Sequence, residues 1–314
     1  MRDHGVQRNS RNGMLLALPT PLTTVFERPQ ERVLDWADRD ANPFFHFMES
    51  LWMLAGRNDV DWISKFSSNI AQFSDDGVIF HGAYGERWRC NFSMDQIRVI
   101  AQALGEDHNC RRQVLTMWDP IMDLGNSCKD VPCNTQAYLQ VNTSGGLDLM
   151  VTNRSNDMIW GAYGANAVHF SMLQEVIASL AGLKVGRYYQ VSMNTHVYER
   201  HWKLMNLLAD RAPDPMAQQR HDDADPYAHG VVRPSDVVLN PDSWFRDLDT
   251  FMKGETGGSN PFFSDIAAPL RDAWMIFKNR RDDPNRIRLA VNAAQDCAAG
   301  DWRRAAILWL ERRR

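Results

Sequence analysis

The chain has 314 residues, of which 44% are hydrophobic, 10% are aromatic and 24% are charged. This composition is typical of a globular protein and excludes a disordered or collagen-like chain. With 35 basic and 39 acidic residues the formal net charge is −4. No overall basic field would attract a nucleic-acid backbone, so we expect no nucleic-acid partner.

The sequence also lacks the signals of membrane, secreted and metal-binding proteins. No apolar run approaches the roughly 20 residues that span a bilayer, and the N-terminal residues contain no apolar segment like that of a secretory signal. The five cysteines are scattered and include no CxxC pair, which indicates neither a disulfide framework nor a metal site. We expect a soluble cytoplasmic protein without a membrane partner or a metal.

Two helices are predicted in the first third of the chain. Asn42 and Pro43 provide a cap and an N1 proline for the first helix, and Gly56 ends it. Ser93 and Gln96 form a capping box for the second helix, which ends at Gly105.

The middle of the chain predicts a sheet and the remainder predicts helices. Residues 112–118 are strand-like, and residues 133–143 and 147–155 predict a β-hairpin around two glycines. A helix over 166–180, a strand over 187–193 and a helix from Thr195 follow. Residues 209–230 predict a polar surface excursion, and residues 262–278 and 285–312 have helical patterns. We expect an α+β fold with a mainly antiparallel sheet in one domain, 1–314, in which 209–280 has no assigned role.

Cys133 is the clearest candidate for chemistry, because it follows a proline at the start of a predicted strand. A buried cysteine acting as a small hydrophobic side chain is the alternative. Two arginine groups, Arg111–Arg112 and Arg154–Ser155, lie in the flanking segments, and Arg11 lies in a predicted loop. Guanidinium groups bind phosphate in bidentate fashion and lower the pKa of a nearby thiol, although charge pairing on a solvated face is the alternative.

Three further side chains are candidates. His196 and Tyr198 are two residues apart, so they face the same way on a strand and diverge on a helix; such a pair can hydrogen-bond a sugar hydroxyl. Glu49 lies near the buried side of an apolar helix, where a carboxylate is costly unless it is paired or used. It is therefore either a proton-handling group or one half of a buried ion pair.

Five short motifs occur in a fixed order: RR at 111–112, WDP at 118–120, PC at 132–133, RSND at 154–157 followed by Gly161, and THVY at 195–198. Together they resemble the thymidylate synthase family, which includes the deoxycytidylate and deoxyuridylate hydroxymethylases. The resemblance extends from about Arg11 through His201. It implies a large mixed sheet that packs back to back with that of a second subunit in a homodimer.

The resemblance also implies a mechanism, in which Cys133 adds to C6 of a pyrimidine so that C5 attacks the methylene carbon of methylenetetrahydrofolate. Arg11, Arg154 and Ser155 would hold the phosphate, with Arg111 and Arg112 reaching in from the partner subunit. His196 and Tyr198 would bind the sugar. The remaining implied roles are proton handling by Glu49, assistance to C5 proton removal by Tyr84, a catalytic position at Asn134, and folate binding by Asp157 and Gly161.

Departures from the synthase pattern point to a subtype. Asn134 replaces a histidine, and the asparagine that reads uracil aligns with Ala165, beside which Asn166 is a possible substitute. Ala71 stands where synthases have a shielding tryptophan, and the last four residues are Glu311–Arg314 rather than small and apolar. An unshielded methylene group would be hydrated, giving a hydroxymethyl product. Arg112 and Ser155, which ribonucleotide-preferring members replace, favour a deoxynucleotide.

We therefore expect hydroxymethylation of dCMP first, with methylenetetrahydrofolate as the co-substrate. The spellings RSND and HVYERH are the basis for preferring dCMP. The alternatives are dUMP as substrate, giving hydroxymethyl-dUMP or dTMP, and a non-catalytic nucleotide- or RNA-binding relative. Hydroxymethylases of this type serve bacteriophages, so a phage source would place the reaction in the host cytoplasm.

Overall fold

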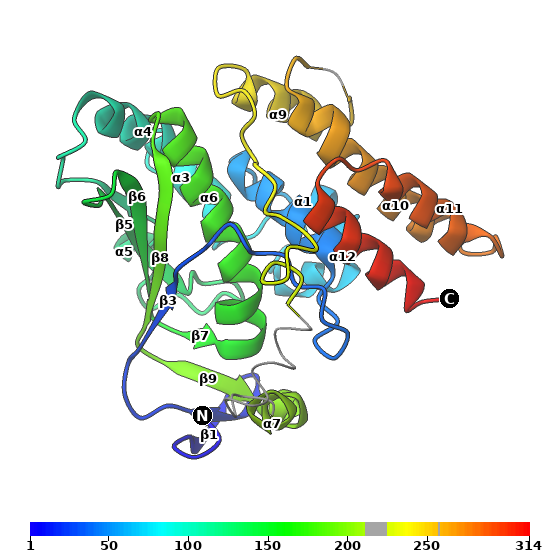
Figure 1. Cartoon of the computed structure of the whole chain (residues 1–314). Coiled ribbons are helices and arrows are strands. Elements are labelled where there is room, and N and C mark those ends of the chain that lie inside the picture. The colour runs from blue at the N-terminus through cyan, green and yellow to red at the C-terminus, as the bar shows by residue number, and fades with distance from the viewer. Residues whose placement is uncertain (211–224, 257) are drawn as a thin grey trace.

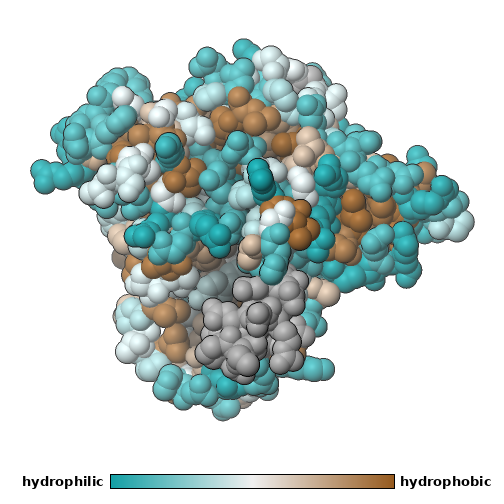
Figure 2. Space-filling view, in the orientation of Figure 1, coloured by the Kyte–Doolittle hydropathy of each residue, from teal (hydrophilic) through white to brown (hydrophobic). Residues whose placement is uncertain are grey.

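A computed structural model describes residues 1–210, 225–256 and 258–314. The predicted surface excursion, residues 209–230, lies mostly outside the described residues, which do not include 211–224. Figure 1 shows a layered arrangement, with a sheet on one side, helix α1 in the middle and the C-terminal helices on the other side. On the face seen in Figure 2 the surface is mostly hydrophilic, with scattered apolar patches.

The strands of the described residues form two sheets. The larger sheet has the order β3–β8–β6–β5–β4, in which only β6 and β8 are parallel. The smaller sheet has the order β1–β2–β9–β7. The strand bounds are β1 Val6–Ser10, β2 Gly13–Ala17, β3 Leu22–Phe26, β4 Val114–Thr116, β5 Asn134–Val141, β6 Gly146–Asn153, β7 Asn156–Asp157, β8 Lys184–Ser192 and β9 Thr195–Tyr198.

Helices cover the inner face of the larger sheet and build the rest of the described chain. The α-helices are α1 Pro43–Leu54, α2 Val60–Ser64, α3 Tyr84–Arg89, α4 Gln96–Glu106, α5 Pro120–Asp123, α6 Asn166–Leu180, α7 Trp202–Asp210, α9 Trp244–Met252, α10 Ala268–Asn279, α11 Arg286–Gln295 and α12 Gly300–Glu311. Shorter or wider helical turns are η1 Ser68–Phe73, η2 Met158–Ala165, η3 Glu199–His201 and η4 Phe262–Ala267.

The structure confirms several predicted elements. In α1 the Asn42 side chain accepts a hydrogen bond from the Phe45 N–H at 3.2 Å, and Gly56 has a φ of +74°, which ends the helix. Helix α6 has the predicted bounds, with Gly182 at φ +70° behind it. The predicted hairpin is β5–β6, closed by Gly145 at φ +78°. The α+β class with mainly antiparallel pairing is correct.

Other predictions were wrong in ways that have physical reasons. The cap of α4 is Asp95, which accepts from the Arg98 N–H, while the Gln96 side chain bonds the backbone of β4 and of Arg87. The expected helix at Thr195 begins as strand β9, because Leu15, Leu16 and Ala17 of β2 pair with it. The long C-terminal helical pattern is two helices, α11 and α12. Strand β1 was not predicted, because all five of its residues are exposed and the segment has no alternation of apolar and polar side chains.

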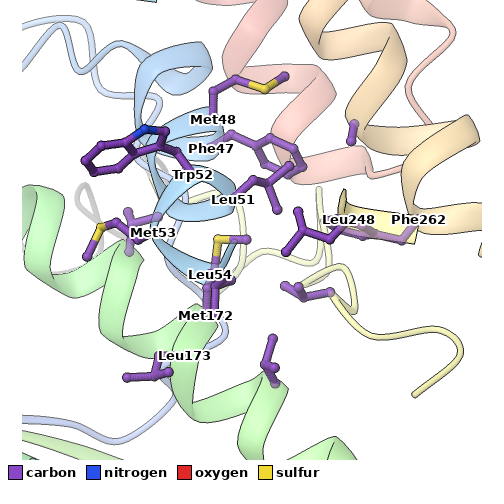
Figure 3. Close-up of a cluster of buried hydrophobic side chains, with 14 of the residues drawn as sticks. Phe47, Met48, Leu51, Trp52, Met53, Leu54, Met172, Leu173, Leu248 and Phe262 are labelled. Carbon is purple, nitrogen blue, oxygen red and sulfur yellow. The ribbon is translucent and has the colours of Figure 1, made fainter. Parts of the chain in front are cut away.

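The main hydrophobic core lies between α1, α6 and the C-terminal helices (Figure 3). Phe47 of α1 contacts Trp302 and Phe262, with ring centroids 4.9 and 5.7 Å apart, while Met172 and Leu173 of α6 lie on the other side of α1. Burying side chains of this size contributes roughly 1.5–3 kcal/mol each to folding. No helix in residues 1–210, 225–256 and 258–314 is long and apolar enough to cross a membrane.

Candidate active site

Cys133 lies directly before β5, half-buried, at the end of the hairpin where the chain turns toward β7. The backbone N–H groups of Cys133 and Asn134 both donate to the Tyr84 hydroxyl oxygen, at 3.0 and 3.1 Å. Burial raises the pKa of Tyr84 well above its usual value, so this hydroxyl stays protonated. Because its oxygen already accepts two bonds, the Tyr84 O–H is left as a donor.

The charges around Cys133 oppose one another. Burial raises the pKa of the Cys133 thiol, and the Asp130 carboxylate raises it further, whereas Arg154 and Arg11 lower it. The pKa of Asp130 is itself raised, first by burial, and the charge of Glu49 adds to the effect. The net result is a thiol that ionises less readily than a free cysteine.

Arg154 and Arg11 come together from different sheets on the segment that precedes Cys133. Arg154 donates to the carbonyls of Pro132 at 2.7 Å and Val131 at 2.8 Å. Arg11, in the turn between β1 and β2, donates to the carbonyls of Cys128 and Lys129. Ser155 is half-buried in the bend after β6. Two guanidinium groups thus lie close enough to Cys133 to lower its pKa, and groups of this kind can bind a phosphate.

Arg111 and Arg112 lie elsewhere. Both are exposed and precede β4, the edge strand of the larger sheet. The cations whose charges act on Cys133 are Arg154 and Arg11. The structure of one chain therefore does not bring the Arg111–Arg112 pair into this site.

His196 and Tyr198 share one side of β9, with ring centroids 5.0 Å apart. The Asn12 amide, next to Arg11, donates to the Tyr198 hydroxyl at 3.4 Å. The β1–β2 turn therefore joins the His–Tyr pair to the arginine pair. This arrangement places two side chains that can hydrogen-bond a hydroxyl group close to a guanidinium group.

Glu49 points from α1 toward α6, where its Oε2 lies 3.1 Å from His169 Nε2. Its side chain is 15% exposed. The pair matches the ion-pair interpretation of Glu49, and the effect of its charge on Asp130 places it within electrostatic reach of the Cys133 pocket as well. Both interpretations of Glu49 therefore have support in the geometry.

Asn134 and Asn166 are joined by a hydrogen bond from the Asn134 amide to Asn166 Oδ1 at 3.2 Å. Asn166 in turn donates to Asn156 at 3.1 Å, so its amide is held in place rather than free. Ala165, at the end of η2, offers no polar side-chain group. A Cβ atom on Gly161 would lie 2.5 Å from Asn156 Oδ1, so a glycine is needed for these amides to meet.

Asp157 caps η2 through Oδ1, which accepts from the N–H groups of Ile159 and Trp160. Its Oδ2 is buried and has no hydrogen-bond partner within the described part of the chain. A buried carboxylate oxygen with free acceptor capacity is suited to a ligand that carries N–H groups.

No sequence pattern predicted a functional role for Arg39, which lies in a charged run. Its guanidinium group is buried, stacks 4.3 Å from the Trp160 ring centroid and donates to the Ile159 carbonyl at 2.9 Å. Its Nε and Nη1 have no partner among residues 1–210, 225–256 and 258–314. Arg39 and Asp157 thus offer unused cationic and anionic groups around η2.

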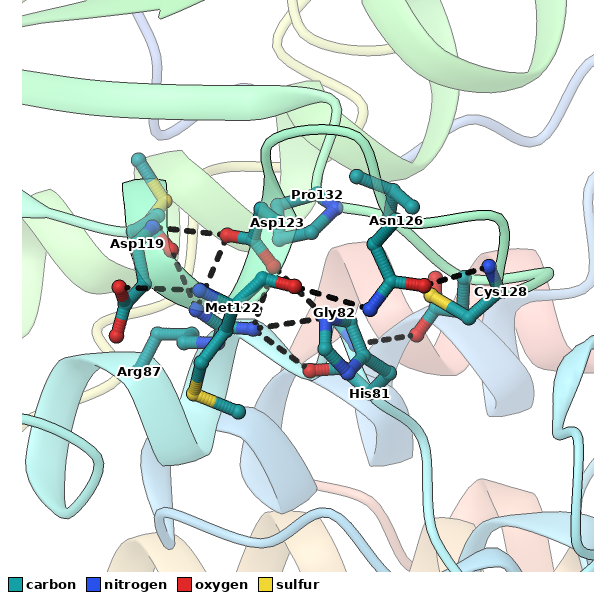
Figure 4. A network of polar contacts seen from close by, with 12 residues as sticks. His81, Gly82, Arg87, Asp119, Met122, Asp123, Asn126, Cys128 and Pro132 are labelled. Atoms are coloured by element: carbon teal, nitrogen blue, oxygen red, sulfur yellow. Dashed lines mark hydrogen bonds and ion pairs between the residues drawn. The ribbon is translucent and has the colours of Figure 1, made fainter.

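A second unforeseen feature braces the loop before Cys133 (Figure 4). Arg87, fully buried in α3, donates to both oxygens of Asp123 at 3.1 and 2.9 Å, and His81 Nε2 lies 2.8 Å from Asp123. The Gly82 N–H donates to Asp130 at 3.0 Å. Gly85, Arg87 and Trp88 of the GERW motif are all buried, and no sequence pattern distinguished Arg87 from an exposed arginine.

Comparisons with known proteins agree with this geometry. The family model described as thymidylate synthase matches residues 39–240, more than half of the chain. The chain belongs to the thymidylate synthase family. It is therefore an enzyme that transfers a methyl or hydroxymethyl group to C5 of a pyrimidine nucleotide, with folate as the family's one-carbon donor.

Two similar proteins share the name deoxyuridylate hydroxymethyltransferase. The chain is 49% identical over 313 residues to a deoxyuridylate hydroxymethyltransferase of Pseudomonas phage M6, covering 99% of this chain and 88% of that protein. It is 36% identical over 259 residues to the protein so named in Bacillus phage SP01, covering 74% of this chain and 67% of that protein.

Proposed function

We propose that the protein converts dUMP to 5-hydroxymethyl-dUMP. The observation that carries the proposal is that the charges of Arg154 and Arg11 act on Cys133, in a chain 49% identical to a deoxyuridylate hydroxymethyltransferase. The hydrogen bond from Asn12 to Tyr198 joins the turn that holds Arg11 to the His196–Tyr198 pair. The same relatives make dUMP, rather than dCMP, the substrate to test first.

Arg11, Arg154 and Ser155 bind the 5′-phosphate in this proposal. Both arginines at present bond backbone carbonyls between Cys128 and Pro132, and a phosphate would replace neutral acceptors with anionic ones that bind a guanidinium group more strongly. His196 and Tyr198 then face the 3′-hydroxyl. Phosphate and sugar together fix the pyrimidine ring over Cys133.

Cys133 acts as the nucleophile, forming an S–C6 bond while the electron pair of the C5=C6 bond moves onto C5. Methylenetetrahydrofolate, when bound, supplies the one-carbon unit that C5 attacks. The C5 proton leaves toward a water held by the Tyr84 O–H, with Glu49 moving protons on the base. The electron pair of the C5–H bond forms an exocyclic double bond to the transferred carbon, whose bond to the folate nitrogen breaks so that tetrahydrofolate departs. Water then adds to the transferred carbon, its second proton goes to solvent, and the Cys133 thiolate leaves C6.

Asp157 and Arg39 fit the folate. A pterin presents N–H groups to an acceptor, which the unpaired Asp157 Oδ2 supplies, and the unpaired nitrogens of the neighbouring Arg39 can donate to the acceptor atoms of the same ring system. Trp160, 47% exposed, offers an aromatic face between them. Gly161 contributes by leaving room for the amides behind η2.

A homodimer completes the site in this proposal. The outer face of the larger sheet exposes apolar side chains on three strands, namely Val25 on β3, Tyr138 on β5 and Val114 on β4. Packing this face against a second copy would bury them and would let the exposed Arg111–Arg112 pair reach the partner's phosphate site. Sedimentation velocity would show a dimer, and mixing Cys133→Ala with Arg112→Ala subunits would restore partial activity if arginines cross the interface.

The test incubates the protein with methylenetetrahydrofolate and either dUMP or dCMP, followed by mass analysis of the nucleotide and absorbance of the folate. We expect dUMP to gain CH2O with release of tetrahydrofolate. A gain of CH2 with dihydrofolate would identify a synthase, and a CH2O gain on dCMP alone would restore the cytosine assignment. Absence of any product would contradict the enzymatic proposal.

A further inference from the structure

Asp130 is a carboxylate three residues before Cys133 that has no part in the steps described so far. Its Oδ2 accepts a hydrogen bond from the Gly82 N–H at 3.0 Å, and the Cys133 N–H donates to the Tyr84 hydroxyl at 3.0 Å. The two segments that contain these residues are therefore joined at both ends. A Cβ atom on Gly82 would lie 2.6 Å from the Asp130 carbonyl oxygen, so this close approach requires a glycine.

The charge of Asp130 acts on the groups of the candidate site. Burial is the largest cause of the raised pKa of Cys133 and of the raised pKa of Tyr84, and the Asp130 carboxylate adds to both shifts. Burial also raises the pKa of Asp130 itself, and the charge of Glu49 adds to that shift. Because such interactions weaken with distance, Asp130, Glu49, Tyr84 and Cys133 form one cluster.

One carboxylate oxygen of Asp130 is free to accept a hydrogen bond. Oδ2 receives the Gly82 N–H, whereas Oδ1 has no hydrogen-bond partner and no ion-pair partner within residues 1–210, 225–256 and 258–314. The residue is half-buried, so water can reach it. Glu49 differs, because its Oε2 lies 3.1 Å from His169 Nε2. An unpaired carboxylate whose pKa is raised by burial is a stronger base than an exposed one.

We propose that Asp130 is the general base that takes a proton from the water added to the transferred carbon, an inference that rests on the reaction proposed above. The water oxygen bonds to the exocyclic carbon, and the electron pair of the exocyclic double bond moves to C5. This pair re-forms the C5=C6 bond as the S–C6 bond breaks with its electrons on Cys133. Asp130 passes the proton to solvent. Asp130 thus serves the step that makes the product a hydroxymethyl group.

The experiment is a single turnover with excess protein, methylenetetrahydrofolate and dUMP that carries tritium at C5. Tritium release reports removal of the C5 proton, which precedes hydration, and mass analysis reports the CH2O product. Asp130→Asn keeps an oxygen for the Gly82 N–H but removes the base, so we expect CH2O formation to slow by about 100-fold. Tritium release should not slow by more than about threefold, because loss of the negative charge favours the Cys133 thiolate.

Two further measurements separate a lost base from a damaged site. Added mercaptoethanol forms a thiolate that adds to the exocyclic carbon without giving up a proton. Asp130→Asn should therefore release the nucleotide as a thioether at nearly the rate of tritium release. Asp130→Glu restores a carboxylate and should recover part of the CH2O formation, which also keeps the test available if the asparagine variant does not fold.

Asp75→Asn is the matched control. Asp75 also accepts a backbone N–H from this loop, that of Lys129 at 3.1 Å, but it is exposed. Its replacement should leave both rates unchanged. Equal slowing of tritium release and CH2O formation in Asp130→Asn would overturn the inference, and so would CH2O formation within about threefold of the wild type.

The same experiment distinguishes failure of the inference from failure of the proposed function. A wild type that hydroxymethylates only dCMP would refute the proposed substrate alone, because the two rates must separate in Asp130→Asn with either nucleotide. A wild type that adds CH2 to dUMP would refute the proposed reaction and this inference together.

Discussion

The end of the sheet around Cys133 and the C-terminal helices are built on opposite principles. The sheet end buries polar groups, including three asparagine side chains, and connects them by directional hydrogen bonds. Helices α9–α12 bury aromatic side chains, with Trp274 between Phe44 and Trp309 at 5.6 and 5.8 Å. Hydrogen bonds dictate the position of each atom, whereas apolar packing tolerates exchange at constant volume.

Helix α1 belongs to both regions. Phe44 and Phe47 face the aromatic side chains of the C-terminal helices, while His46 and Glu49 face α6 and the pocket. One face of α1 thus carries side chains that stabilise the chain by packing, and another face carries titratable side chains. We expect substitutions in the two regions to affect different measurements.

The largest expected effect is on turnover at the sheet end. Cys133→Ala removes the nucleophile and should lower kcat by at least about 10⁴-fold. Nucleotide binding, measured by calorimetry, should change little because the arginines remain. The buried Cys297→Ala, in the C-terminal region, is the control and should keep full turnover. Full turnover in Cys133→Ala would show that Cys133 is not the nucleophile.

The second prediction concerns the C-terminal helices, where we expect a loss of stability without a loss of turnover. Trp244 is fully buried and its indole N–H donates to the Val237 carbonyl at 3.0 Å. Trp244→Ala should reduce the free energy of unfolding by about 3–5 kcal/mol, measured by denaturant titration. The kcat of the folded fraction should stay within about twofold of the wild type. A large loss of kcat at full folding would show that this region also positions the site.

A smaller effect tests the charges around Cys133. Asp130→Asn removes a negative charge that raises the thiol pKa, so alkylation of Cys133 at pH 8 should become about two- to fivefold faster. Arg154→Gln should slow the reaction, because a charge that lowers the pKa is lost. Peptide mass spectrometry would follow Cys133 separately, with the exposed Asp61→Asn as the control. Slower alkylation in Asp130→Asn, or faster alkylation in Arg154→Gln, would contradict the electrostatic account.

A further prediction concerns stability at low pH. Burial, followed by the charges of His169 and Arg39, lowers the pKa of His46 to about 3, against 6.5 in an unfolded chain. The stability from keeping this ring neutral is present above pH 6.5 and is lost as the pH falls toward 3. Between pH 7 and pH 4 the wild type should lose about 2–3 kcal/mol more than His46→Leu. Parallel pH profiles for the two proteins would contradict this pKa.

The sequence predicted the fold best where local signals and tertiary pairing agreed. Asn42, Pro43 and Gly56 mark the ends of α1 by chain-local chemistry, and the double glycine marks the β5–β6 turn. The prediction failed at Thr195, where the partner strand β2 lies almost 180 residues earlier and outweighs the local helical pattern. Periodicity contains no information about such long-range pairing.

The candidate site divides in the same way. Cys133, Arg154 and Asn134 could be found because they lie next to one another at the ends of predicted strands. Arg39 could not, since its position in the site depends on a contact with η2 that no local pattern encodes.

The most direct test of the central claim is a competition in one reaction, with equal dUMP and dCMP, methylenetetrahydrofolate and the unmodified protein, followed by mass analysis of both nucleotides. We predict that dUMP gains CH2O while dCMP remains unchanged. Conversion of dCMP in preference to dUMP, or a CH2 gain on dUMP, would contradict the account.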